Sequence, residues 1–296
     1  MFQLAVISDE VSQDLDTVIE FAQRFRLAGI EVRSLWDKGP FDFSPADVEK
    51  IRRKTAEAGL AVPCIGSPFF KCDIGDEAAA AAHLEGLKRC IDAALALGAP
   101  LIRGFSFWKK GNLPLAAVAE RFAPVVPLLE SAGLTLVLEP DPAVNTPNGR
   151  ALAQLLGLIG SPRVAALWDP GNIIFDDAGE CPYPDGYEAV KPYLRHMHLK
   201  DARRVDGAAQ AVAVGTGEVD MAGQFARLLA DGYSGWVSLE THYRLARTIS
   251  EESMRLPSGS GFSEGGYAAS ADCLAHFYRL LEREVPGALP QAPPKG

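Results

Sequence analysis

Three carboxylates and one imidazole occupy matching places at the ends of four successive apolar segments. Glu139 ends TLVLE, Asp169 ends VAALWD, His198 lies in LRHMHLK and Glu240 ends GWVSLE. If these segments are parallel strands of one barrel, their carboxyl ends form one mouth. Three carboxylates that converge there without a counter-charge repel one another, and a divalent cation removes that conflict. This donor set suits one Mn²⁺, Mg²⁺, Co²⁺ or Zn²⁺ ion, which we therefore predict as a cofactor.

Helix capping is the simpler explanation for any single acid at the end of a strand. However, Glu139 is followed by Pro140, and Asp169 by Pro170 and Gly171. We therefore expect that neither acid leads directly into a helix that it caps. The occurrence of four ligand types on four consecutive strands favours the metal site.

The heptad RHMHLKD places His196, His198 and Lys200 on one face of its strand, because strand side chains alternate. A surface strand with solvated charges, or a core histidine bonded to backbone, would give the same pattern. With the other three strand ends considered, we expect His198 to be a metal ligand. His196 is then a buried supporter one layer below, and Lys200 lies at the rim.

The elements that position these residues alternate between strands and helices along the chain. Predicted strands are 3–8, 30–34, 60–66, 100–105, 135–139, 164–169, 194–200 and 235–240. Predicted helices are 15–27, the segment from Ser44-Pro45 to Gly59, 78–97, 114–131, 147–159, 186–192, 221–230 and 268–284.

Eight βα units without a linker predict the α/β class, as a single (β/α)8 TIM barrel of parallel strands over residues 1–285. A doubly wound sheet is the alternative, but no G-x-G-x-x-G follows the first strand. Residues 251–266 form a Gly/Ser-rich insertion, and residues 286–296 a proline-rich tail that we expect to be flexible.

Composition limits the partners and the compartment. The net charge of −9 and the pI near 5.1 argue against nucleic acid and anionic membranes, both of which require a basic face. The sequence contains no apolar run long enough for a membrane helix and no signal-peptide pattern at its start. Five cysteines without CxxC spacing suggest reduced thiols. We expect a cytoplasmic protein that acts on a small molecule.

Several motifs resemble the sugar phosphate isomerase/epimerase superfamily, the xylose isomerase-like TIM barrels that include ketose 3-epimerases, hydroxypyruvate isomerase and inosose dehydratase. They are LEP at Glu139, WDPGN at Asp169, HMHLKD at His198 and SLE at Glu240, with IEVRSLW and CIGSPF upstream. The resemblance implies one divalent metal bound by Glu139, Asp169, His198 and Glu240. It also implies that Glu139 and Glu240 are catalytic and move protons. Relatives often form homo-oligomers, which is an open alternative here.

One position departs from this pattern. Asn172 stands where several relatives have a histidine that the multi-metal apurinic endonucleases require, which argues against that DNA-repair branch. The expected function is isomerisation or epimerisation of a sugar, sugar phosphate or small hydroxy-ketone, by proton abstraction next to a metal-polarised carbonyl. The alternatives are a metal-dependent dehydratase of an inosose- or dehydroshikimate-like substrate and a non-catalytic carbohydrate-binding barrel.

Further polar and aromatic residues near the predicted strand ends are candidates for binding the substrate. They are Glu31, Arg33, Trp36, Arg103, Trp108, Asn172, Lys200 and Arg204. Purely structural ion pairs, Glu31 with Arg33 or a glutamate with Lys200, are the alternative for these charged residues, and loop packing is the alternative for the tryptophans. The resemblance implies Arg204, because some relatives have an arginine six residues beyond the ligand histidine. The segment Gly215-Thr216-Gly217-Glu218 resembles a family loop that could cradle a phosphate, although such glycine turns are common.

Overall fold

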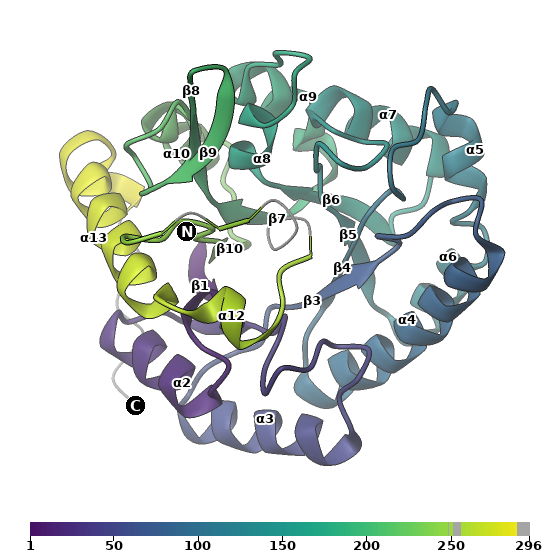
Figure 1. Ribbon diagram of the computed structural model, residues 1–296, viewed down its shortest axis with the longest axis horizontal. Helices are drawn as coiled ribbons and strands as arrows, with labels where there is room; N and C mark the ends of the chain where they lie inside the picture. Colours follow the sequence, from purple (N-terminus) through teal and green to yellow (C-terminus); the bar gives the residue numbers. More distant parts are fainter. Residues whose placement is uncertain (248, 251–255, 289–296) are drawn as a thin grey trace.

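Eight parallel strands surrounded by helices form the centre of the computed structural model, which describes residues 1–247, 249–250 and 256–288 (Figure 1). The hydrogen-bonded order is β2-β1-β10-β7-β6-β5-β4-β3. Isolated parallel bridges, Gly29 to Ala61 and Val32 to Ile65, join the two end strands. The predicted TIM barrel is confirmed. Its strands are β1 Gln3–Ile7, β2 Gly29–Glu31, β3 Cys64–Phe69, β4 Leu101–Gly104, β5 Thr135–Leu138, β6 Val164–Trp168, β7 Leu194–Leu199 and β10 Trp236–Leu239.

Amphipathic helices follow most of the strands and cover the outside of the barrel (Figure 1). The longer helices are α2 Leu15–Arg24, α3 Pro45–Glu57, α4 Glu77–Leu97, α5 Leu115–Glu120, α6 Val125–Ala132, α7 Gly149–Ile159, α10 Met221–Ala230 and α13 Gly266–Glu284. Short helical turns are α1 Ser8–Val11, α8 Pro170–Ile174, η1 Pro182–Gly186, α9 Tyr187–Val190, η2 Lys191–Tyr193, α12 Gly259–Ser263 and η3 Pro286–Ala288.

Prolines explain two differences from the predicted elements. The third strand begins at Cys64 instead of Leu60, because Pro63 has no N–H to continue the ladder. The helix predicted over 114–131 is divided into α5 and α6, and Pro124 lies at the division.

Some elements were not predicted at all. A β-hairpin, β8 Asp201–Val205 with β9 Ala208–Val212, follows β7 at the barrel mouth. The expected insertion 251–266 contains α12, which packs against α1, whereas residues 251–255 lie outside the described residues. Of the predicted tail, residues 286–288 form η3, and 289–296 lie outside the described part. In the described part of the chain, no helix combines the length and the apolarity that crossing a membrane requires.

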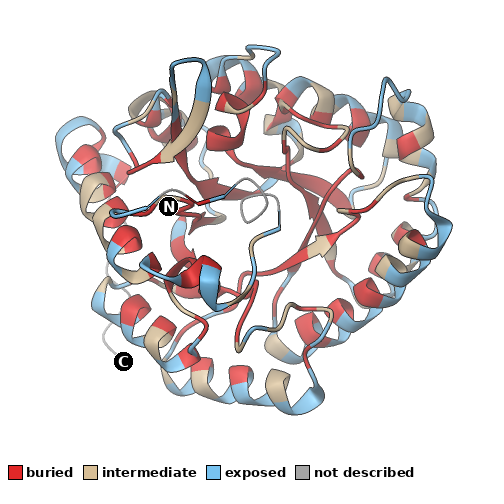
Figure 2. Cartoon of the chain, in the orientation of Figure 1, coloured by how far each residue is buried: buried red, intermediate tan, exposed pale blue. Residues whose placement is uncertain are grey.

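Most of the apolar core lies between the strands and the surrounding helices (Figure 2). A small second cluster contains Cys64 of β3, Leu101 of β4, Val137 of β5, and Ala165 and Leu167 of β6. By contrast, β2 and β7 bring Glu31, His196 and His198 into buried positions. The carboxyl ends of the strands therefore surround buried ionisable side chains.

Candidate metal centre

The four predicted ligand residues lie together, although they are far apart in the sequence. Glu139 follows β5, Asp169 follows β6, His198 lies in β7 and Glu240 follows β10. One ligand-type atom from each lies within 4.8 Å of the others, and all four residues are buried. All four positions lie at the carboxyl ends of their strands, as the sequence argument required, although the register pairs His198 with Ser238, two residues before Glu240.

The imidazole of His198 turns Nδ1 toward the centre of this cluster. Nδ1 lies 3.6 Å from Glu139 Oε1, 3.6 Å from Glu240 Oε2 and 3.9 Å from Asp169 Oδ2. Nδ1 and Asp169 Oδ2 are both buried and accept or donate no hydrogen bond within the described residues. Buried polar atoms without a partner are costly, and a bound cation would satisfy both. The donor set therefore fits a divalent metal ion.

Asp169 also caps a helix, contrary to our expectation. Its Oδ1 accepts a hydrogen bond of 3.0 Å from the Asn172 backbone N–H, so Asp169 is the N-cap of α8. Pro170 does not prevent this, because proline is favoured at the first helical position. The two oxygens therefore differ: Oδ1 holds the helix, whereas Oδ2 faces the cluster.

Counter-charges are present as well, which corrects the premise that the carboxylates converge without them. Lys200 Nζ donates to Glu240 Oε2 at 3.0 Å and to Asn172 Oδ1 at 2.8 Å. Arg103 pairs with Glu139 at 3.1 Å and lies 3.7 Å from Glu240. Asn172 Nδ2 also donates to Glu139 Oε1, at 2.9 Å. Each glutamate of the cluster is thus held in a fixed orientation.

These neighbours give the acids of the cluster different acidities. Burial alone would raise the pKa of Glu139, but Arg103 and His198 lower it to about 2. Lys200 and the histidines likewise hold the pKa of Glu240 well below its usual value, against the effect of burial. Asp169 is the exception, because burial and the charges of Glu240 and Glu139 raise its pKa to about 8. Only at Asp169 do burial and the neighbouring carboxylates together outweigh the nearby cation, Lys200.

Glu31 lies beneath His198 and also contacts His196. Glu31 Oε2 is 2.8 Å from His196 Nε2, and Oε1 is 3.4 Å from His198 Nε2. All three side chains are fully buried. Glu31, which the sequence suggested for substrate binding, is placed to orient the ligand histidine, and His196 belongs to this lower layer.

Arg33 links the cluster to acids that we did not predict. Its guanidinium contacts Asp9 at 2.8 Å, Glu10 at 2.8 Å and Glu240 at 2.5 Å. Removing one partner of such a buried network typically costs about 3–5 kcal/mol, because the remaining charges stay buried. Asp9 and Glu10 lie in α1, two and three residues after the end of β1, so the strand-end rule used for the other acids also reaches them.

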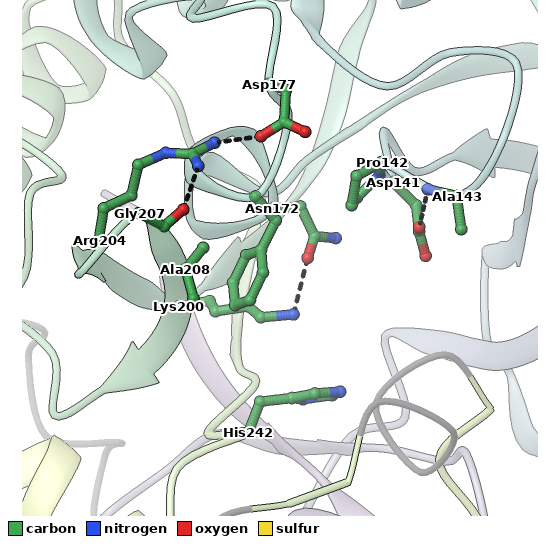
Figure 3. A pocket seen from close by; sticks show the side chains of 12 residues that line it. Asp141, Pro142, Ala143, Asn172, Asp177, Lys200, Arg204, Gly207, Ala208 and His242 are labelled. Carbon is green, nitrogen blue, oxygen red and sulfur yellow. Dashed lines mark hydrogen bonds and ion pairs between the residues drawn. The ribbon is translucent and has the colours of Figure 1, made fainter.

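A cavity of about 500 Å³ opens beside the cluster (Figure 3). Its wall includes three predicted substrate residues, Asn172, Lys200 and Arg204, together with His242. The hairpin β8–β9 contributes Gly207, Ala208 and Ala209 to the wall. Arg204 is paired with Asp177 at 3.1 Å.

A second cavity, of about 330 Å³, is lined by Arg33 and Arg103, among others. The two tryptophans lie outside the walls of both cavities within the described residues. Trp36 packs against Phe43 and beneath Lys50. Trp108 lies beneath Lys71, whose ion pair with Asp141 reaches the wall of the larger cavity.

The glycine loop that could have cradled a phosphate is filled by a side chain of the protein. Asp201 Oδ2 accepts hydrogen bonds from the backbone N–H groups of Gly215 and Gly217, both at 2.8 Å. Asp201 Oδ1 accepts from the Ala202 and Val219 N–H groups. This aspartate occupies the amides that an anionic ligand would need.

Comparisons with known proteins agree with this geometry. The model of the xylose isomerase-like TIM barrel family matches residues 19–272. The search of curated proteins finds no match.

Solved structures show the same fold at low sequence identity. D-allulose 3-epimerase from Methylomonas sp. in complex with D-allulose is 18% identical, with a TM-score of 0.71 over 94% of this chain and 96% of that one. The probable 3-DHS dehydratase AsbF from Bacillus anthracis is 15% identical, with a TM-score of 0.72 over 95% and 100%. The IolI protein with a zinc atom is 13% identical, with a TM-score of 0.72 over 96% and 99%.

Proposed function

The chain belongs to the xylose isomerase-like TIM barrel family, and from this premise we propose that it is a divalent-metal-dependent isomerase or epimerase. Its substrate is a sugar, a sugar phosphate or a small hydroxy-ketone, which loses the proton next to a metal-polarised carbonyl. The observation that carries the proposal is the cluster of Glu139, Asp169, His198 and Glu240, in which two buried atoms make no hydrogen bond with the described residues.

The charge of the buried network supports a divalent ion. Among the described residues, ion pairs and hydrogen bonds connect six carboxylates with four Arg or Lys side chains: Asp9, Glu10, Glu31, Glu139, Asp169 and Glu240 with Arg33, Arg103, Lys200 and Arg244. When all six acids are ionised and the histidines are neutral, as metal ligation requires, two negative charges remain uncompensated. One Mn²⁺, Mg²⁺, Co²⁺ or Zn²⁺ ion would balance them.

Glu139 and Glu240 are the proposed acid and base. Arg103 Nη1 lies near both carboxylates, 3.1 Å from Glu139 and 3.7 Å from Glu240. The bound metal would supply polarisation of the substrate carbonyl. One glutamate would take the proton from the adjacent carbon, and the other, once it has itself been protonated, would return a proton. Their lowered pKa values keep the resting carboxylates ionised, so either can accept a proton, and the one that returns a proton must first take one up.

Asn172, Lys200 and Arg204 are the proposed substrate contacts in the larger cavity, and Arg33 and Arg103 those in the smaller one. Lys200 and Asn172 connect the wall of the larger cavity to Glu240 and Glu139, so a substrate held there would lie next to both bases. The roles of Trp36 and Trp108 as apolar walls of the substrate site remain predictions.

Exchange of substrate hydrogen with solvent tests the reaction. Purified protein loaded with Mn²⁺ is incubated in D₂O with a panel of ketoses, aldoses and inososes. We expect deuterium at the carbon next to the carbonyl of an isomerised or epimerised product. Loss of water from the product would identify a dehydratase instead. A protein with no affinity for Mn²⁺ or Zn²⁺ would support the non-catalytic binding barrel and contradict the proposal.

The variant Glu139→Gln separates proton transfer from metal binding. We expect turnover to fall by about 10²–10⁴-fold, the range typical of a lost acid or base. Metal content should be retained, because three ligands remain. The exposed Glu282→Gln is the control and should behave as wild type. A metal-loaded Glu139→Gln protein with full activity would exclude this role.

A further inference from the structure

His242 lies between two cavities, two residues beyond the proposed base Glu240. One is the cavity of about 500 Å³ that Lys200 and Asn172 also line. The other has a volume of about 310 Å³ and is lined by residues of β8, β9 and the segment after β10. Figure 3 shows the His242 ring pointing into the larger cavity, on the side facing Lys200. No motif in the sequence predicted a role for this histidine.

Glu10 fixes His242 at two points, one with each carboxylate oxygen. Oε2 accepts a hydrogen bond of 3.0 Å from the His242 backbone N–H, and Oε1 lies 2.7 Å from the ring Nδ1. Arg33 and Arg244 hold Glu10 in turn, and Phe262 packs edge-on against the imidazole.

The backbone of His242 is also unusual, because its φ of 42° lies in the left-handed region. Non-glycine residues adopt this region at a cost, and such strain is concentrated at functional sites. The surrounding contacts therefore maintain one costly orientation of this ring.

These contacts determine which nitrogen is available to a ligand. His242 Nδ1 lies 2.7 Å from Glu10 Oε1, although the contact does not have hydrogen-bond geometry. A carboxylate this close favours the hydrogen on Nδ1, so a neutral imidazole presents Nε2 as an acceptor. No hydrogen bond from a described residue reaches Nε2. The carboxylates in the same wall, Asp141 and Asp177, are already paired with Lys71 and Arg204. Among the described residues that line the larger cavity, Lys200 provides N–H donors and His242 provides a neutral acceptor, Nε2.

We propose that His242 binds the substrate by accepting a hydrogen bond from one of its hydroxyl groups at Nε2, with Glu10 as the positioning residue. This inference rests on the proposed function and extends it: the substrate carries a hydroxyl beyond the two carbons that react. A hydroxyl group both donates and accepts, so Lys200 and His242 together match one polyol end of a sugar.

Kinetics with D-allulose test this role, or with the most rapidly exchanging ketose of the panel if D-allulose does not react. His242→Phe keeps the size of the ring and removes both nitrogens. We expect KM to rise about 10-fold, the loss of one hydrogen bond, with a smaller change in kcat. His242→Gln, which keeps an acceptor near the position of Nε2, should recover part of the loss.

Two further measurements exclude a structural cause. Mn²⁺ affinity measured by calorimetry should be unchanged in His242→Phe and His242→Gln, because His242 is not a proposed ligand. His276→Gln, on the outer helix α13, is the matched control and should leave KM unchanged.

The outcomes separate the two proposals. Wild-type protein without exchange on any sugar defeats the proposed function. Wild-type exchange with an unchanged KM in both His242 variants defeats only the present inference. A His242→Phe protein that loses Mn²⁺ affinity also contradicts it, because the ring would then act through the metal. If His242→Phe does not fold, the KM of His242→Gln is compared with that of His276→Gln. A higher KM in His242→Gln supports the inference, and equal KM values overturn it.

Discussion

Glu31 is a single buried carboxylate shared by two histidines, of which only His198 faces the metal cluster. Its contact with His198 Nε2 leaves Nδ1 directed at the cluster. Outer contacts of this kind fix the orientation and the tautomer of a metal-binding imidazole. The carboxylate therefore acts on the metal site without touching the metal.

Glu31→Gln should lower the affinity for Mn²⁺ by about 10–100-fold, the usual effect of removing such a partner. The amide keeps the shape of the side chain but not its charge. Titration of metal-free protein with Mn²⁺ in a calorimeter measures the effect, and Glu282→Gln serves as an exposed control. Wild-type affinity in Glu31→Gln would show that the charge beneath His198 is irrelevant.

The ligand residues could be predicted because alternation along a strand and the common level of strand ends fix where they lie. Asp9 and Glu10, which lie just beyond the predicted strand 3–8, were missed because the turn α1 was not recognised. His242 has no such signal. Its position depends on a left-handed backbone and on contacts with Glu10, more than 200 residues away in the sequence.

The loop from Gly215 to Val219 is organised around Asp201, whose carboxylate accepts from four backbone N–H groups. Gly217 is needed for close approach at this point. A Cβ there would lie 2.2 Å from Asp201 Oδ1 and 2.5 Å from the Ala202 carbonyl oxygen.

Gly217→Ala should therefore lower the free energy of unfolding by about 1–3 kcal/mol, as overpacking at a tight site does. Urea denaturation measures the change. Gly39→Ala is the matched control, since a Cβ at Gly39 meets nothing within 4 Å and should be tolerated. Equal stability of the two variants would mean that the loop around Asp201 can move to accept a Cβ at position 217 at little cost.

At the level of elements, the glycine motif could be recognised in the sequence, but the side chain that fills it, Asp201, could not be predicted. Asp201 opens the hairpin β8–β9, and the sequence predicted only a strand that ended at Lys200. Pro63 and Pro124 likewise shifted or divided elements that hydrophobic periodicity alone had placed as continuous.

Across the whole molecule, the metal is expected to act as a stabilising ligand. The buried network has two uncompensated negative charges when its six acids are ionised and its histidines are neutral. The ligands come from four separate strands. A ligand that binds only the folded state stabilises it by about 2.7 kcal/mol at a concentration of about 100 Kd.

Removing metal with a chelator should therefore lower the Tm by several degrees, and adding Mn²⁺ should restore it in a concentration-dependent way. Differential scanning calorimetry at fixed pH and ionic strength measures this. Ca²⁺, which prefers six to eight oxygen ligands, is the comparison ion and should restore less. A Tm indifferent to chelator and Mn²⁺ would argue against a metal that joins the four strands.

The barrel as a whole was predictable because eight βα repeats leave few alternatives for a chain of this length. The balance of charge at its mouth was not, since it depends on how far each Arg and Lys reaches across the barrel. Arg33 on one side and Lys200 on the other both reach Glu240, and no local pattern contains that information.

The two oxygens of Asp169 imply different tolerances to change during evolution. Asparagine at this position would keep the oxygen that caps α8 and lose the charge that faces the metal. The barrel could then persist after its chemistry was lost, with little trace in the surrounding helix. An asparagine aligned with Asp169 in a distant relative would thus indicate a protein that has lost catalytic activity but kept the barrel fold.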